Sequence, residues 1–192
     1  MRKLMDYTAH YDSPLGGITL ASDGEKLVGL WFDGQKYFAD TLGNVYEERP
    51  GLDIFETTRR WLDIYFSGHA PNFTPPLQMR TTDFRKRVGE IMLTIPFGKT
   101  MTYGDIARII ARERGLTSMS AQAVGGAVGH NSISLIIPCH RVVGTGGSLT
   151  GYAGGIDKKV QLLKMEGCDR YLSFVTCSEC KDRVAAKGTS SF

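Results

Sequence analysis

The sequence of 192 residues has no cysteine before residue 139, and its four cysteines all lie in the last third of the chain. A disulfide framework needs paired cysteines spread through a small secreted domain, so this distribution argues against one and fits a reducing compartment. No run of about 18 apolar residues is present, and the basic N-terminus lacks the apolar stretch of a signal peptide. We therefore expect a cytoplasmic protein that does not enter a membrane.

Repeats and low-complexity tracts are also missing, while 42% of the residues are hydrophobic and 22% are charged, as in ordinary globular domains. Residues 1–79 carry 7 Lys and Arg against 11 Asp and Glu, whereas residues 80–192 carry 16 against 9. The net charge thus changes from −4 to +7 between the two parts. A basic C-terminal part fits a polyanionic partner such as nucleic acid, and a solvated basic surface gives the same count.

The N-terminal part has the patterns of a mixed α/β unit. Residues 16–32 read as two strands joined at Asp23-Gly24, a dipeptide that accepts the positive φ angles of a hairpin turn. Apolar residues recur at helical spacing over residues 52–66, and Gly68 supplies a stop. The proline-rich stretch that follows predicts an extended connector, so we place a domain boundary near residue 80.

The C-terminal part begins with an amphipathic helix that Pro96 ends. Thr102 and Asp105 form a variant of the capping box, which predicts a second helix beginning at Tyr103. We expect that helix to stop at Gly115, because glycine is common just beyond a helix end.

A shorter helix follows, with Ser118 or Ser120 as its N-cap and Gly129 at its end. Two short helices joined by a tight glycine-containing loop have the outline of a helix-turn-helix. The second helix carries almost no large polar side chain that could read bases in a major groove, so packing against the core is a competing interpretation.

A last helix is expected after the glycine-rich residues 144–155. Ile156, Val160 and Leu163 form its apolar stripe, and Glu166 lies at its end. Residues 171–192 read as a polar tail.

The stretch IIPCHRVVG, residues 136–144, could place Cys139 in a core, in a metal site or at a reactive centre. A lone cysteine after apolar residues is by default a small buried hydrophobe. Against that default, Pro138 is expected to end a strand, His140 adds a titratable base and Arg141 adds a positive charge that favours a thiolate. Such neighbours suit a nucleophile, since free cysteine has a pKa of about 8.5.

Two other chemistries are less well supported. Cys177 and Cys180 have the spacing of a zinc pair, but no second pair lies near them, and their place in a polar tail does not fit a thioredoxin-like redox motif. A cysteine hydrolase needs its histidine against the sulfur, whereas neighbours on a strand point to opposite faces. His140 reaches Cys139 only if the backbone turns or a water bridges the two side chains.

Pro138-Cys139-His140-Arg141-Val142, preceded by AVGGAVGHN and followed by GYAGG and a helix ending in Glu166, resembles the O6-alkylguanine-DNA alkyltransferases, or methylated-DNA–protein-cysteine methyltransferases. The resemblance covers about residues 82–167, and the N-terminal part agrees in size and type. It implies an α/β plus α chain: a ribonuclease H-like α/β domain at residues 1–80, then a winged-helix-type domain with a helix-turn-helix at residues 81–170, which binds DNA and carries catalysis.

The resemblance further implies a DNA repair protein that flips O6-alkylguanine, chiefly O6-methylguanine, out of duplex DNA. The alkyl group passes irreversibly to the protein's own cysteine, so each molecule reacts once, with no cofactor and no metal. Double-stranded DNA would be bound through its minor groove by a monomer. Base flipping costs a few kcal/mol, and least for a weakly paired, damaged base.

Carried onto this chain, the resemblance makes Cys139 the nucleophile and His140 a base that acts through a bound water. Glu166 would orient His140, and Asn131 would brace the active-site loop. The implied substrate-binding residues are Tyr103, Val142, Tyr152, Ala153, Gly154 and Lys159. The implied DNA-binding residues are Tyr103, Ser120, Ala121, Gln122, Ala123, Gly125 and Arg141. For Lys159, an exposed helix lysine is an equally good interpretation.

One position departs from the family pattern. The arginine that fills the space left by the extruded base aligns with Gln122, which can fill the gap and bond an orphaned cytosine but carries no charge. We therefore expect weaker non-specific DNA binding than in an arginine-bearing relative. The zinc ligands of some relatives are missing too, because no cysteine precedes residue 139.

Two other functions compete with repair. Alkyltransferase-like proteins recognise lesions without repairing them, but they lack the cysteine that is present here. A transcription regulator could use the helix-turn-helix, yet no separate regulatory domain is visible in this length.

Overall fold

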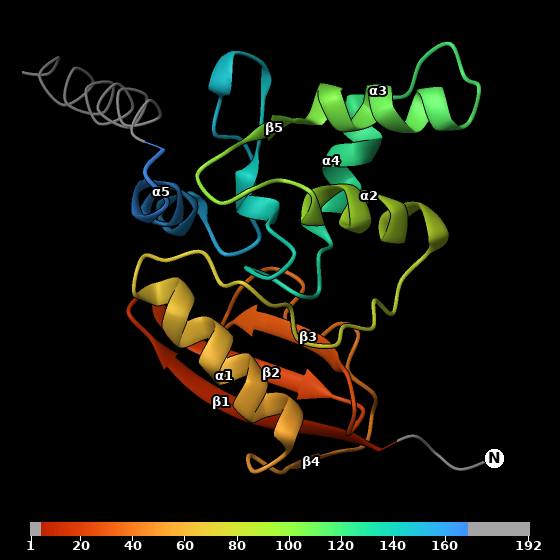
Figure 1. Ribbon diagram of the computed structural model, residues 1–192. Coiled ribbons are helices and arrows are strands. Elements are labelled where there is room, and N and C mark those ends of the chain that lie inside the picture. The colour runs from red at the N-terminus through yellow and green to blue at the C-terminus, as the bar shows by residue number, and fades with distance from the viewer. Residues whose placement is uncertain (1–4, 169–192) are drawn as a thin grey trace, which may run out of the picture.

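The computed structural model describes residues 5–168, so Cys177, Cys180 and the tail predicted at residues 171–192 lie outside the described residues. The N-terminal part is a sheet with one helix against it (Figure 1). Its strands are β1 (Asp6–Ser13), β2 (Gly16–Ser22), β3 (Leu27–Phe32) and β4 (Tyr46–Glu48). They lie in the order β3-β2-β1-β4, with β4 parallel to β1 and the other pairs antiparallel.

The hairpin and the first helix were both predicted, and both are confirmed. β2 and β3 pair in antiparallel register from Ile18 opposite Phe32, and Gly24 in the turn has a φ of 106° that suits glycine. The helix α1 (Asp53–Phe66) buries the predicted apolar face, and Gly68 just beyond it has a φ of 83°. The last turn of α1 faces the C-terminal part of the chain (Figure 1).

The C-terminal part is mostly helical (Figure 1). Its regular elements are α2 (Asp83–Leu93), β5 (Met101–Thr102), α3 (Tyr103–Glu113), α4 (Ala121–Gly129), β6 (Val142–Val143) and α5 (Ile156–Met165). Two short 3-10 helices, η1 (Cys139–Arg141) and η2 (Thr145–Gly147), flank β6. β5 and β6 form a small parallel pair.

The predicted capping signals explain where α3 and α4 begin. The Thr102 hydroxyl accepts a hydrogen bond from the Asp105 backbone N–H, and the Asp105 carboxylate accepts one from the Thr102 N–H, which completes the capping box. Ser120, and not Ser118, caps α4, since its hydroxyl accepts from the Ala123 N–H at 3.3 Å. α3 and α4 pack against each other as a helix pair.

The expected strand before Cys139 is absent, which corrects the sequence interpretation. Ile133 makes an isolated bridge to Leu30, and residues 134–136 then form a turn, with Ile137 N–H bonded to the Ile133 carbonyl and Leu135 in the left-handed region at φ 67°. Cys139 then begins a turn of 3-10 helix instead of ending a strand. The apolar stripe of α5 is also partly wrong, because Ile156 is 39% exposed while the other two members are buried.

The two parts share one hydrophobic core. Leu30 of β3 donates its N–H to the Ser132 carbonyl and accepts from the Ser134 N–H, which ties the loop before Cys139 to the N-terminal sheet. Arg80 in the connector binds the Asp6 carboxylate with two hydrogen bonds of 2.7 Å. The N-terminal part therefore helps to fix the loop that precedes Cys139.

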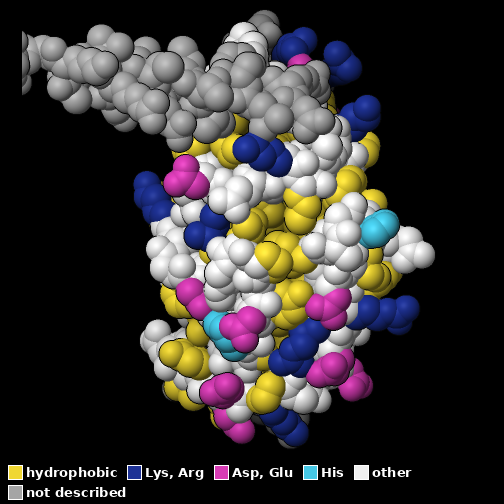
Figure 2. Space-filling view, turned by 90° about the vertical axis from the view of Figure 1, so that its left-hand side faces the viewer, with side chains coloured by type: hydrophobic (Ala, Val, Ile, Leu, Met, Phe, Trp, Pro, Cys, Tyr) yellow, Lys and Arg dark blue, Asp and Glu magenta, His cyan; other side chains and the backbone are white. Residues whose placement is uncertain are grey.

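The charge asymmetry seen in the sequence is visible on the surface. In Figure 2, most Asp and Glu side chains lie over the lower half of the molecule, where the N-terminal strands lie, and hydrophobic side chains are exposed down the centre of this face. None of the helices within residues 5–168 is long and apolar enough to cross a membrane.

Candidate active site

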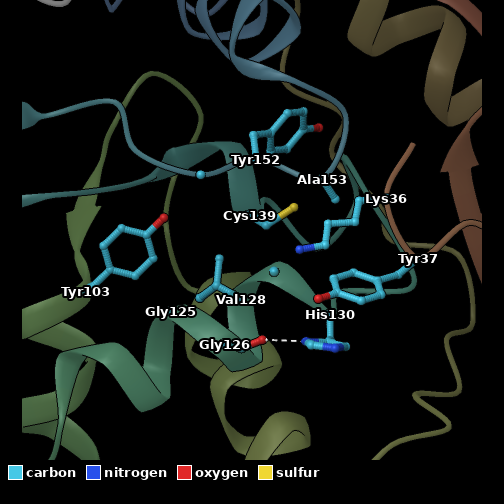
Figure 3. Close-up of a pocket in the computed structure, with 12 residues that line it drawn as sticks. Lys36, Tyr37, Tyr103, Gly125, Gly126, Val128, His130, Cys139, Tyr152 and Ala153 are labelled. Carbon is cyan, nitrogen blue, oxygen red and sulfur yellow. Dashed lines mark hydrogen bonds between the residues drawn. The ribbon is translucent and has the colours of Figure 1, made fainter. Parts of the chain in front are cut away.

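A cavity of about 280 Å³ opens beside Cys139 and receives residues from both parts of the chain (Figure 3). In Figure 3 the Cys139 sulfur lies between Tyr103 on one side and Tyr37 on the other, with Tyr152 and Ala153 above it. The lining residues are Lys36, Tyr37, Tyr103, Gly125, Gly126, Val128, Gly129, His130, Cys139, Gly151, Tyr152 and Ala153.

The Cys139 thiol is almost completely shielded, with 3% of the residue exposed. Its sulfur accepts a hydrogen bond from Asn131 Nδ2 at 3.2 Å. Burial raises the pKa of the Cys139 thiol, and the Asn131 hydrogen bond and the charge of Lys159 offset this only in part. Neighbouring positive charge thus acts in the expected direction, but it comes from Lys159, and desolvation outweighs it in this resting state.

Asn131 follows α4 and holds the whole turn that precedes Cys139. Its side-chain nitrogen also donates to the carbonyls of Ile133 and Ile137, at 3.2 and 2.8 Å, and its oxygen accepts from the Ile133 N–H. One amide group thus binds both ends of the turn and the sulfur. This geometry matches the bracing role expected for Asn131.

Lys159 is fully buried, at 0% exposure, so the alternative of an exposed helix lysine is overturned. Its ammonium group donates to the carbonyls of Val142, Thr150 and Gly151 at 2.7, 3.3 and 3.3 Å. Burial lowers the pKa of Lys159 to about 8, and the neighbouring Cys139 acts in the opposite direction. Lys159 thereby joins α5, β6 and the loop over the cavity, and it places a cation near the thiol.

His140 points away from solvent and pairs with the carboxylate of Glu166. Its Nε2 donates to Glu166 Oε1 at 2.7 Å, while its Nδ1 is buried and has no hydrogen-bond partner within the protein. A carboxylate only accepts, so Nε2 carries the proton and Nδ1 keeps its lone pair. Burial lowers the pKa of His140 although Glu166 raises it, and the neutral ring is a base with Nδ1 ready to accept a proton.

Glu166 receives hydrogen bonds from four residues and is only 5% exposed. Besides His140, the donors are Tyr65 OH at 2.8 Å, the Gly98 N–H at 3.0 Å, and Arg141 Nε and Nη2 at 2.8 and 3.1 Å. Burial raises the pKa of Glu166, but the hydrogen bonds from His140 and Arg141 and the Arg141 charge outweigh it and lower that pKa to about 2. Glu166 is a carboxylate at any working pH.

The structure contradicts the prediction that the Arg141 side chain contacts DNA. Arg141 is 8% exposed, and besides its bonds to Glu166 it donates through Nη1 to the Ile95 carbonyl at 2.6 Å. Its guanidinium neutralises a buried carboxylate, so it is unavailable to a partner outside the protein. A basic residue in the sequence does not by itself show whether its charge points to solvent or into the protein.

Three of the six predicted substrate-binding residues line the cavity, and the other three, Val142, Gly154 and the buried Lys159, do not. Tyr103, Tyr152 and Ala153 form its walls. Val142 is buried in β6, where its carbonyl accepts from Lys159, and Gly154 lies behind Tyr152. A methyl group on Gly154 would lie 2.8 Å from the Tyr152 ring, so this glycine is required for the close approach of that ring.

The predicted DNA-binding residues of α4 lie beside a second, more open hollow of about 670 Å³. Ala121, Gln122 and Gly125 line it together with Tyr103, whereas Ser120 and Ala123 are exposed outside it. Tyr103 and Gly125 line both spaces, so the hollow leads from the exposed side of α4 towards the cavity at Cys139.

Sequence reasoning missed the contribution of the N-terminal part. Tyr37 adopts a left-handed φ of 60° and stacks on His130, with ring centroids 3.9 Å apart, and the Lys36 backbone N–H donates to the Ala153 carbonyl at 3.0 Å. Tyr65 reaches Glu166 from α1. No local pattern marks these residues, because they meet the site only through the tertiary fold. Within residues 5–168, no cluster of three or more His, Cys, Asp or Glu residues could hold a metal ion.

Two family models match the chain in succession. The model described as 6-O-methylguanine DNA methyltransferase, ribonuclease-like domain, matches residues 7–79. The model described as 6-O-methylguanine DNA methyltransferase, DNA binding domain, matches residues 83–168.

Curated proteins and solved structures with similar sequences point the same way. A methylated-DNA–protein-cysteine methyltransferase of Mycobacterium tuberculosis (strain ATCC 25618 / H37Rv) is 42% identical over 160 residues, which cover 82% of this chain and 92% of that protein. The crystal structure of Mycobacterium tuberculosis OGT in complex with DNA has a TM-score of 0.70 and 41% identity, and the match covers 84% of this chain and 92% of that one. An O6-methylguanine DNA methyltransferase from Methanococcus jannaschii has a TM-score of 0.57 and 28% identity, with 82% and 92% covered.

Proposed function

This chain belongs to the 6-O-methylguanine DNA methyltransferase family, and from its site we propose that it repairs O6-alkylguanine in DNA by taking the alkyl group onto Cys139. The predicted order of a ribonuclease-like α/β domain and a DNA-binding domain is confirmed by the two family matches. We place the division between them near residue 80, in the extended connector before α2. The observation that carries the proposal is the buried thiol at the floor of a cavity that opens towards α4.

The reaction we propose is a single displacement. The Cys139 sulfur forms a bond to the alkyl carbon while the bond from that carbon to O6 of guanine breaks, and the electron pair of that bond stays with the base. The thiol proton leaves towards Nδ1 of His140, through a bound water, and the guanine takes up a proton in its place. The product is a thioether on Cys139 and an unmodified guanine, so one protein molecule repairs one lesion.

The other predicted residues have roles that fit this step. Asn131 holds the sulfur in place through its hydrogen bond, and Glu166 fixes the Nε2–H tautomer that leaves Nδ1 free. Lys159 supplies a nearby cation when the thiol loses its proton. Since burial keeps the thiol protonated at rest, the proton transfer and the displacement must be coupled once a base occupies the cavity.

The DNA is proposed to lie against the exposed side of α4, with the target base passing Tyr103 to reach Cys139. Gly125 and Gly126 leave room along the shared wall of the hollow and the cavity. We infer that α4 enters the minor groove, because its small side chains allow the helix backbone to approach the DNA closely and read little of the base sequence. We also propose that the protein binds DNA as a monomer. Gln122 lies at the rim of the hollow, where it can fill the gap in the base stack.

Gln122→Arg is expected to tighten binding to undamaged duplex DNA and to steepen its salt dependence. One added phosphate contact changes the slope of log K against log salt by about 0.9 for duplex DNA. Fluorescence anisotropy with a labelled duplex over a series of salt concentrations measures both effects.

Gln161→Arg is the matched control, because Gln161 is exposed on α5 away from the hollow and receives the same charge. Its salt slope should stay near that of the unmodified protein. An unchanged slope in the Gln122 variant, or equal changes in both, would refute the placement of DNA along α4.

The proposed function is tested by the fate of the lesion. The protein is incubated with a duplex that contains a single O6-methylguanine, and both the DNA nucleosides and the intact protein mass are measured. Repair requires that guanine replaces O6-methylguanine and that the protein gains the mass of one methyl group in place of a hydrogen. Tight binding with no change in either mass would instead support a lesion-binding protein.

A further inference from the structure

Tyr65, on the last turn of α1, brings the N-terminal domain into the catalytic network. Its hydroxyl donates to Glu166 Oε1 at 2.8 Å and lies 3.2 Å from His140 Nε2. Residue 65 and residue 166 are 101 positions apart in the chain, and the end of α1 faces the C-terminal part (Figure 1). All three side chains are buried, so water does not compete for these bonds.

The ring of Tyr65 is held by packing that does not depend on its hydroxyl. Trp61 stacks on it with a centroid distance of 5.2 Å, and Phe97 meets it edge-on at 6.0 Å. Aromatic contacts of this kind fix a ring in one position. The hydroxyl is therefore presented to Glu166 in a set direction, and a phenylalanine would keep the ring where it is.

Tyr65 and His140 donate to the same carboxylate oxygen, Oε1 of Glu166. Each donor that binds an oxygen reduces the charge that the oxygen offers to the other donor. Without the tyrosine proton, more of the charge would act on His140 and would favour the protonated imidazolium. The other charged groups that face His140 are Arg141, on the same 3-10 helix, and Lys159 on α5, and both disfavour its protonation.

We propose that Tyr65 is a positioning residue for alkyl transfer: its hydroxyl shares the Glu166 oxygen that binds His140 and so keeps His140 neutral and able to accept the thiol proton. The inference rests on the proposed function, since it assigns His140 the role of base. It gives the ribonuclease-like domain a direct part in the chemistry of the other domain. Tyr65 touches neither the sulfur nor the cavity, and it acts only through Glu166 and His140.

The test is the pH dependence of single-turnover methyl transfer from an O6-methylguanine duplex. In Tyr65→Phe, loss of the donor should raise the pKa of His140, so the acidic limb of the rate profile moves to higher pH by about one unit. On that limb the variant reacts about tenfold more slowly, while the rate at high pH and the affinity for the duplex stay close to the unmodified values. A purely structural role would lower the melting temperature without moving the limb.

Tyr11→Phe is the matched control. The Tyr11 hydroxyl also donates to a carboxylate on α1, Asp63, at 2.8 Å, but it has no contact with His140. This variant loses the same kind of bond, from a tyrosine hydroxyl to a carboxylate, at the same helix α1, and its rate profile should not move.

A second variant separates the effect of the hydrogen bond from any effect on folding. Tyr65→3-fluorotyrosine retains the hydroxyl and nearly the same size but is a stronger donor, so the acidic limb should move to lower pH. The proposal is overturned if the limb stays in place in either variant, or if both variants move it in the same direction. Failure of the proposed function is a different result, because the unmodified protein would then transfer no methyl group at all.

Discussion

Cys139→Ala is expected to abolish alkyl transfer completely while leaving DNA binding intact. The thiol is the nucleophilic sulfur at the cavity, and the methyl group of alanine cannot form the new bond to carbon. The side chain is hydrogen-bonded to Asn131, which still holds the turn through two carbonyls when the sulfur is removed. Single-turnover assays with an O6-methylguanine duplex measure the transfer, and anisotropy measures the binding.

Cys168→Ala is the control for that experiment, because Cys168 is buried beside Val143 and Leu163 and does not line the cavity. It should transfer the methyl group at close to the unmodified rate. Residual transfer in Cys139→Ala, or loss of transfer in Cys168→Ala alone, would show that the reactive thiol is not the one at the cavity.

Glu166→Gln is expected to reduce both the rate and the stability strongly. The amide cannot balance the buried Arg141 guanidinium, and removing one partner of a buried pair costs about 3 to 5 kcal/mol. It also no longer fixes the protonated Nε2 of His140, so the base loses its tautomer and the rate should fall by about a hundredfold. Urea unfolding and single-turnover kinetics measure the two effects.

Glu113→Gln removes a carboxylate from an arginine on the surface, where Glu113 binds Arg87. Exposed ion pairs contribute little, so this variant should have nearly unchanged stability and rate. Equal behaviour of the two variants would show that burial of Glu166 has no bearing on the site.

The same carboxylate makes stability depend on pH in a defined window. Glu166 has its pKa lowered from 4.5 to about 2 by the donors around it. A group with a lowered pKa in the folded state stabilises the fold above its ordinary pKa, and that contribution is lost as the pH falls through the folded value. In Glu166→Gln the part of the acid transition between these two values should disappear, as thermal melts across acidic pH will show.

Local sequence signals predicted the elements well where a single mechanism decides them. The capping box at Thr102 and the turn at Gly24 depend on neighbours within four residues, and both are confirmed. The strand expected before Cys139 failed for the opposite reason. Three apolar residues are buried there in a turn, since Asn131 and Leu30 supply the hydrogen bonds that a strand partner would otherwise provide.

The candidate site also divides into residues that the sequence marks and residues that only the tertiary fold brings in. The resemblance predicted Cys139, His140, Glu166 and Asn131 as catalytic residues, and the structure brings them into two hydrogen-bonded pairs. It gave no reason to expect the Arg141 side chain inside the protein, because the guanidinium points inward only to bind Glu166, which is distant in the sequence. Residues supplied across the domain boundary carry no sequence signal, and they are the ones that were missed.

The central claim is that Cys139, and no other residue, accepts the alkyl group, once per molecule. The most direct measurement titrates the protein with an O6-methylguanine duplex and follows the methyl groups transferred, with peptide mass mapping of every cysteine. We expect a plateau at one methyl per protein, found entirely on the peptide that contains Cys139. Continued turnover beyond one equivalent, or a methyl group on another cysteine, would contradict it.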